Sequence, residues 1–154
     1  MFENILFCTD FSENAQWAFT YAISLAKTFK SKIFILHVIA EPVHPEQLSA
    51  FLPPEKLKEL KVYWQKEIDR QLEIQYLSKR GRFKSVEVIV KEGEPFVEII
   101  RTARKESASI IVMGTHGRTG LNHVLFGSTA ERVVRKSPCP VLTVRLPGKR
   151  FRMP

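Results

Sequence analysis

The segment SIIVMGTHG (residues 109–117), followed by GSTAERVVRK (residues 127–136), decides how this chain folds. The apolar run that opens it predicts a buried strand, and residues 128–136 predict a helix. Glycines lie between the two. Such a loop in an α/β fold can bind phosphate, because its N–H groups and the helix N-terminus are open to an anion. The alternative is that the glycines only close turns.

The alternation of strand and helix extends along the whole chain. Short apolar runs predict strands at residues 4–9, 32–38, 85–90, 110–113 and 140–144. Apolar residues at helical spacing predict helices after residue 12, over 55–79, from Pro95 onwards and over 128–136. Strand–helix units repeated in this way, and ending in a strand, predict a parallel sheet with helices on both faces.

The connection between the second and third strands is unusually long. Residues 40–54 contain four prolines, which predicts an irregular excursion. The helix after it has an apolar stripe, and we expect this stripe to pack in the core rather than to contact a cofactor. Its members are Leu57, Leu60, Trp64, Ile68 and Leu72. Gly81 is expected to end this helix.

Length and composition indicate one globular domain over residues 1–154. Hydrophobic residues make up 44% and charged residues 26% of the chain, as in an ordinary soluble protein. There is no apolar run of the roughly 20 residues needed to cross a bilayer, and the N-terminus lacks the layout of a signal peptide. We therefore expect a cytoplasmic protein. Cys8 and Cys139 are interpreted as small core hydrophobes.

The net charge of +8 is concentrated in part at the C-terminus. Residues 145–154 contain four basic residues and no acidic one, so they form a basic tail. Such a tail could contact nucleic acid or an anionic surface, and solvated charge is the alternative. Nucleic acid is not an expected partner, because base-stacking aromatics on a sheet face are not evident.

Ligands of open parallel sheets lie beyond the carboxyl ends of the strands. Asp10, just after the first strand, could accept a hydrogen bond from a ribose hydroxyl or from a loop amide. It could equally cap the following helix. Val38, at the end of the second strand, could read the edge of a base through its backbone, and a core valine is the alternative.

The start of the last helix offers further groups for phosphate. Ser128 and Thr129 can donate hydroxyls to an anion, or they can cap the helix. Arg118 could neutralise a terminal phosphate, or it could be a solvated loop residue. His116 has no companions at metal-ligand spacing. The sequence has neither the P-loop nor the G-x-G-x-x-G pattern, and no catalytic set can be assembled from spacing alone.

These residues resemble the universal stress protein family, over nearly the whole chain. The family pattern Gly-x2-Gly-x9-Gly-Ser, which marks the ATP-binding branch, is matched by Gly114, Gly117, Gly127 and Ser128. The segments Met113–Arg118 and Leu36–Val38 match as well. Cys8 stands where relatives often carry proline or alanine.

The resemblance implies a five-stranded sheet of order 3-2-1-4-5, similar to Rossmann-like nucleotide-binding folds. It also implies a homodimer through the C-terminal strand Val141–Val144. ATP is the implied cofactor, and magnesium, where relatives have it, is held mostly by phosphates and water. The implied nucleotide-binding residues are Thr9, Asp10, Val38, Met113, Gly114, His116, Gly117, Arg118, Gly127, Ser128 and Thr129.

The function expected from residues and resemblance together is that of an ATP-binding stress-response dimer with little or no catalysis. One alternative is a slow ATPase or phosphotransferase that uses the same pocket. Catalysis would require a positioned water or base, which the sequence does not indicate. Another alternative is a partner- or nucleic-acid-binding module that acts through the basic tail.

Overall fold

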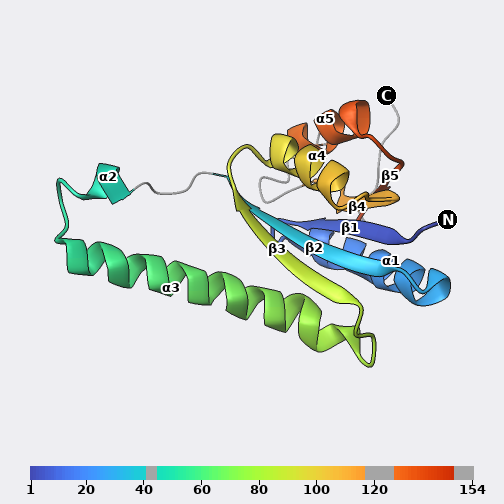
Figure 1. The fold of residues 1–154 in the computed structure, drawn as a ribbon, viewed down its shortest axis with the longest axis horizontal. Coiled ribbons are helices and arrows are strands. Elements are labelled where there is room, and N and C mark those ends of the chain that lie inside the picture. Colours follow the sequence, from blue (N-terminus) through green and yellow to red (C-terminus); the bar gives the residue numbers. More distant parts are fainter. Residues whose placement is uncertain (41–44, 117–126, 148–154) are drawn as a thin grey trace.

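The centre of the computed structural model, which describes residues 1–40, 45–116 and 127–147, is one five-stranded sheet (Figure 1). The strand order is β3-β2-β1-β4-β5, and every neighbouring pair is parallel. The strands are β1 Asn4–Thr9, β2 Lys32–Ile39, β3 Val86–Glu92, β4 Ile110–Gly114 and β5 Val141–Val144. The sheet order implied by the family resemblance is therefore confirmed.

Helices cover both faces of this sheet, as predicted (Figure 1). The helices are α1 Glu13–Phe29, α2 Pro45–Leu48, α3 Pro54–Leu72, α4 Pro95–Lys105 and α5 Ser128–Lys136, of which α2 lies away from the sheet (Figure 1). The side chains of β1 alternate between two core clusters. Ile5 and Phe7 pack with α1 and the end of the long helix, while Leu6 and Cys8 pack with α4 and α5. A strand covered on both faces needs the continuous apolar sequence that these strands have.

Helix α1 lies close to the sheet because its buried face is mostly alanine. Ala15, Ala18, Ala22 and Ala26 are each at most 3% exposed. They recur at intervals of three and four residues, so they form one narrow face with little side-chain bulk. The first turn of α1 is thereby held against the end of β4, which becomes important at the candidate site.

The predicted helix over 55–79 exists, but it is not regular to its end. The α-helical part stops at Leu72 and continues as a π-helical segment η1, Glu73–Leu77, and a 3₁₀ turn η2, Ser78–Arg80. Gly81 follows with a positive φ of 62°, which glycine adopts without strain, so the predicted stop is confirmed. The excursion over 40–54 also differs from the prediction, because it contains the short helix α2.

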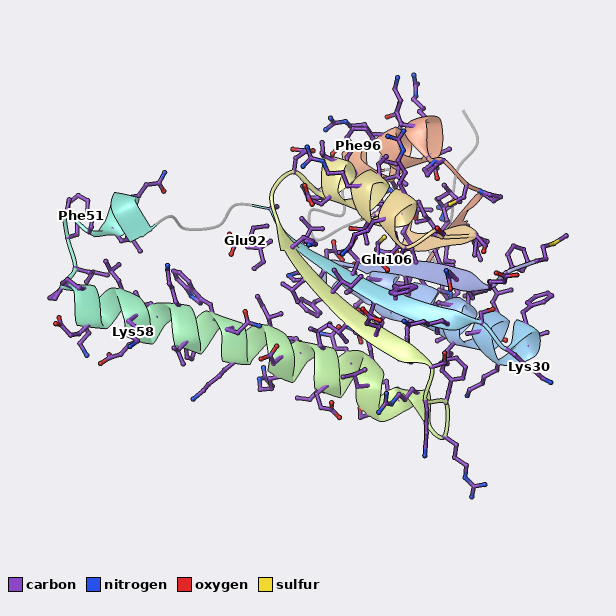
Figure 2. All side chains as sticks on the ribbon, viewed as in Figure 1. Lys30, Phe51, Lys58, Glu92, Phe96 and Glu106 are labelled. Carbon is purple, nitrogen blue, oxygen red and sulfur yellow. The ribbon has the colours of Figure 1, made fainter. Side chains whose placement is uncertain are left out.

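The apolar stripe of α3 is core only in its second half, so our expectation for the first half is wrong. Leu72 is 2% exposed and belongs to the core, with Ile68 packed against it. Trp64 is 37% exposed, and the core clusters do not include it. Figures 1 and 2 show the reason: the start of α3, near Lys58, extends past the end of the sheet. We call residues 47–64 the arm.

Cys8 is buried at 7% exposure, and Cys139 is half-buried against the same cluster, as expected of small core hydrophobes. Within the described ranges, none of the helices combines the length and the apolar character that crossing a bilayer requires. The basic tail falls mostly outside the described residues.

Candidate functional site

A pocket of about 560 Å³ opens where β1, β2 and β4 end at their carboxyl edge. The first residues of α1, α4 and α5 also line it. This is the position in which open parallel sheets bind ligands, and the volume is that of a small-molecule site.

Most of the predicted site residues meet in this pocket. Those that line it are Thr9, Asp10, Val38, Met113, Gly114, His116, Gly127, Ser128 and Thr129. Gly117 and Arg118 lie outside the described residues. The residues come from four separate stretches of sequence, so the fold brings together what the sequence could only place at strand ends.

Other lining residues were not among the predicted set. They are Cys8, Ala15, Leu36, His37, Ile39, Ala40, Pro95, Ile99, Thr115 and Ala130. Pro95 and Ile99 belong to α4, which follows β3. A signal for them existed, because parallel neighbours end at one edge and the helix after β3 must therefore begin beside that edge.

The turn after β1 fixes the position of Asp10. Ser12, and not Asp10, is the N-cap of α1, since its Oγ accepts a hydrogen bond from the Ala15 amide at 3.2 Å. The Asp10 carboxylate instead accepts one from the Ser12 amide at 3.0 Å. The capping alternative for Asp10 is therefore wrong, and its carboxylate supports the loop backbone while it lines the pocket.

The N-terminus of α5 meets the pocket without a side-chain cap. Its N-cap is Gly127, which makes no side-chain capping hydrogen bond and has φ −65° and ψ 154°. Any residue adopts these angles, so the backbone does not require glycine here. Gly127 places no side chain beside the first N–H groups of the helix, and Ser128 and Thr129, which carry them, both line the pocket, where the helix dipole favours an anion.

Thr115 holds the two sides of the glycine-containing segment together. Its amide donates to the Val144 carbonyl at 3.0 Å, and its own carbonyl accepts from the Gly127 amide at 2.8 Å. The Gly127 amide is thus committed to the protein, and the amides that follow it are the ones at the pocket. The Thr115 hydroxyl also lies 3.0 Å from His116 Nδ1.

Val38 is a core residue, as the alternative interpretation had it, and the contact of its backbone with a base stays a prediction. It packs against the core cluster beneath α4 and α5, and it also lines the pocket. Its neighbour His37 is 8% exposed, and its Nδ1 lies 3.0 Å from the Thr9 carbonyl. A carbonyl oxygen only accepts, so this nitrogen carries the proton.

Gly114 lines the pocket, but its missing Cβ serves a different contact. A Cβ built at this position would lie 2.9 Å from Asn14 Cβ and 3.0 Å from the Asn14 carbonyl carbon. The absent side chain therefore allows the first turn of α1 to approach β4.

Burial raises the pKa of the Cys8 thiol, near the end of β1, so the thiol stays protonated at neutral pH.

Comparison with known proteins agrees with this geometry. Residues 1–145 match the model of the universal stress protein family. The chain is 35% identical to universal stress protein MJ0531 of Methanocaldococcus jannaschii, over 97% of this chain and 85% of that protein. The solved structure of MJ0577, described as a hypothetical protein of the same organism, superposes with a TM-score of 0.76 at 35% identity, covering 95% of this chain and 97% of the other. UspA from Lactobacillus plantarum gives a TM-score of 0.72 at 25% identity, covering 94% and 98%.

Proposed function

The chain belongs to the universal stress protein family, and on that premise we propose that it binds ATP in the pocket and that bound nucleotide favours one state of a homodimer. The observation that carries the proposal is the N-terminus of α5. Its N-cap residue, Gly127, lines the pocket and makes no side-chain capping hydrogen bond. The backbone angles of Gly127 do not require glycine. An exposed helix N-terminus without a cap is suited to phosphate.

The proposed orientation follows from the chemistry of the two ends of the pocket. The triphosphate lies at the Ser128 and Thr129 end, where amides and hydroxyls donate. The nucleoside lies between Asp10, whose carboxylate accepts from a ribose hydroxyl, and Val38, whose backbone can pair with a base edge. Pro95 and Ile99 supply apolar surface for the base. The remaining predicted contacts, Gly117 and Arg118 among them, belong to the same proposal.

Magnesium is assigned to the phosphates in this proposal. Within the described part of the chain, no three His, Cys, Asp or Glu side chains gather where they could hold a metal ion. A Mg²⁺ ion that accompanies ATP would take phosphate oxygens and water as ligands, and it keeps several waters in most nucleotide sites. It would neutralise part of the triphosphate charge.

The test is a substitution that separates stability from binding. Gly127→Asp places a favoured N-cap and a negative charge at the start of α5, so the free energy of unfolding should stay equal or rise by about 0.5–1 kcal/mol. The same carboxylate occupies the proposed phosphate position and repels it, so the ATP dissociation constant measured by calorimetry should rise at least about 100-fold.

The matched control is Pro53→Asp, which changes the N-cap of α3 within the arm. This variant should bind ATP as the wild type does. If Gly127→Asp binds ATP within about threefold of wild type, the phosphate is not at α5 and the proposal is wrong. The same samples, incubated with labelled ATP, measure whether phosphate is released and so address the ATPase alternative.

The choice of nucleotide belongs in the same measurement. A universal stress protein 19% identical to this chain, with a TM-score of 0.60, was solved in complex with cAMP. At this identity the likeness concerns the fold alone, so cAMP is included as a competitor and not as the expected ligand. A cyclic phosphate presents one charge to α5 and a triphosphate presents several, which favours ATP at a helix N-terminus.

The proposed dimer interface is the open edge of β5. The carbonyl of Pro140, just before β5, accepts from the Ile111 amide of β4, and the carbonyl of Val144 accepts from the amide of Thr115, just after β4. Because backbone groups of alternate residues point to opposite sides of a strand, those of Val141 and Thr143 face away from β4. An edge strand with outward donors and acceptors can pair with the same strand of a second copy about a two-fold axis.

A further inference from the structure

A buried tyrosine outside the pocket contacts the turn that carries Asp10. Tyr76, in the π-helical segment η1, is 0% exposed. Its Oη lies 2.5 Å from Thr9 Oγ1, and the Phe11 amide donates to the same Oγ1 at 2.9 Å. Thr9 is therefore the point at which the end of β1, the following turn and η1 are joined.

The backbone of this turn is strained, and aromatic rings hold it. Phe11 has a φ of 65°, in the left-handed region that residues other than glycine seldom adopt. Its ring lies 4.3 Å from the His37 ring centroid and is stacked on Tyr76 at 6.3 Å. A strained residue of this kind persists only where its surroundings fix it, and here Tyr76 supplies both a ring and a hydroxyl.

The π-helical segment explains how Tyr76 reaches this position. In an α-helix, residues four apart drift by about 40° around the axis, so a stripe built on that spacing turns away from the sheet. The wider turn over Glu73–Leu77 opposes that drift and keeps Tyr76 on the buried side below Leu72. There its ring also packs edge-on against Phe7 at 5.2 Å and Phe19 at 5.0 Å. π-helical segments of one turn are frequent at functional sites.

We propose that Tyr76 is a positioning residue for the nucleoside end of the pocket: through Thr9 and Phe11 it fixes the turn that directs the Asp10 carboxylate. The inference rests on the proposed nucleotide function and adds a residue that does not itself line the pocket. Asp10 accepts from the Ser12 amide at 3.0 Å, so its direction depends on the backbone of Phe11 between them. Without the contacts of Tyr76, the turn would no longer hold the Asp10 carboxylate in this orientation.

The test is Tyr76→Phe, which removes the hydroxyl and keeps the stacked ring. Because Asp10 lies at the nucleoside end, the dissociation constants for ATP and AMP should rise by the same factor, about 5- to 10-fold for one lost hydrogen bond. Tyr63→Phe is the matched control, because Tyr63 lies on α3 and is 63% exposed. It should leave both constants unchanged.

The same substitution made in the Asp10→Ala variant distinguishes an effect on the orientation of Asp10 from a general loss of stability. In Asp10→Ala the carboxylate that Tyr76 directs is absent, so adding Tyr76→Phe should change ATP affinity by less than about twofold. If Tyr76→Phe weakens binding equally in both backgrounds, or weakens ATP but not AMP, Tyr76 does not act through Asp10 and the inference is overturned.

A readout without nucleotide keeps this inference distinct from the proposed function. The backbone amide signals of Phe11 and Ser12 in a ¹⁵N NMR spectrum should shift in Tyr76→Phe and stay in place in Tyr63→Phe. If the wild type binds neither ATP nor AMP, the nucleotide role fails, and these signals still decide whether Tyr76 fixes the turn. Unchanged amide signals show that it does not.

Discussion

Gly114 offers the most direct test of how closely α1 approaches the sheet. In Gly114→Ala the new Cβ would lie 2.9 Å from Asn14 Cβ, 3.0 Å from the Asn14 carbonyl carbon and 3.2 Å from its oxygen. Two of these three neighbours are backbone atoms, so no side-chain rotation relieves the overlap. Asn14 is itself 7% exposed and sits in the first turn of α1, so the helix end must shift away from β4.

The expected cost is that of an overpacked core, about 1–3 kcal/mol in the free energy of unfolding. For a chain of this size, each 1 kcal/mol lowers the melting temperature by about 2–4 °C, so a decrease of about 2–12 °C should be seen. Urea denaturation followed by circular dichroism measures the free energy, and differential scanning calorimetry measures the temperature.

Gly127→Ala is a useful contrast in the same assay. Gly127 has ordinary backbone angles, so the substitution introduces no backbone strain, and only the modest loss of a glycine N-cap is expected. Gly114→Ala should therefore be the more destabilised variant. A free energy of unfolding for Gly114→Ala within about 0.5 kcal/mol of wild type would refute the argument, because a surface substitution costs no more than that.

Three further predictions concern the arm, the buried tyrosine and the sheet edge. Leu72→Ala should cost about 2–5 kcal/mol of unfolding free energy and Trp64→Ala less than about 1, as measured by urea denaturation, because only Leu72 is in the core; equal losses would place the arm in the core. Burial raises the pKa of the Tyr76 hydroxyl above its ordinary value near 10, so the stability that depends on the neutral form is complete below pH 10 and falls as the pH rises above it. Between pH 10 and pH 12 the free energy of unfolding of Tyr76→Phe should thus fall less than that of wild type. Equal decreases in the two proteins would contradict this. Thr143→Pro removes an N–H that faces away from β4, so light scattering should detect a monomer if β5 pairs with β5 of a second copy, and a persisting dimer would place the interface elsewhere.

The sheet could be predicted because its strands are buried on both faces. Short continuous apolar runs such as Ile5–Cys8, bounded by turn residues, are typical of strands covered on both faces, and the positions of β1, β4 and α5 are confirmed to within a residue or two. The order of the strands could not be predicted from residue patterns. Residue patterns indicated a parallel sheet, and only the family resemblance supplied the order 3-2-1-4-5.

The candidate site could be predicted where the chain itself marks it. Asp10 follows β1, and Val38 and Met113 lie at the carboxyl ends of β2 and β4; parallel neighbours end at one edge, so their meeting in one pocket follows from topology. The role of Gly114 could not be found in this way. Its missing Cβ accommodates Asn14, one hundred residues earlier, and nothing in the local sequence indicates which helix comes close.

The arm shows why helical periodicity gave a wrong prediction for the first half of the apolar stripe of α3. An apolar stripe at helical spacing has the same form whether the helix faces a sheet or solvent, so Leu57 and Leu72 look equivalent in the sequence. Length distinguishes them: the continuous helical segment from α3 through η1 to η2 has 27 residues, about 40 Å, and β3 beside it has 7, about 23 Å. Since η1 anchors the helix at its C-terminal end through Tyr76, the excess length falls at the N-terminal end. The anchoring that places Tyr76 behind Asp10 is therefore also what leaves Trp64 beyond the sheet.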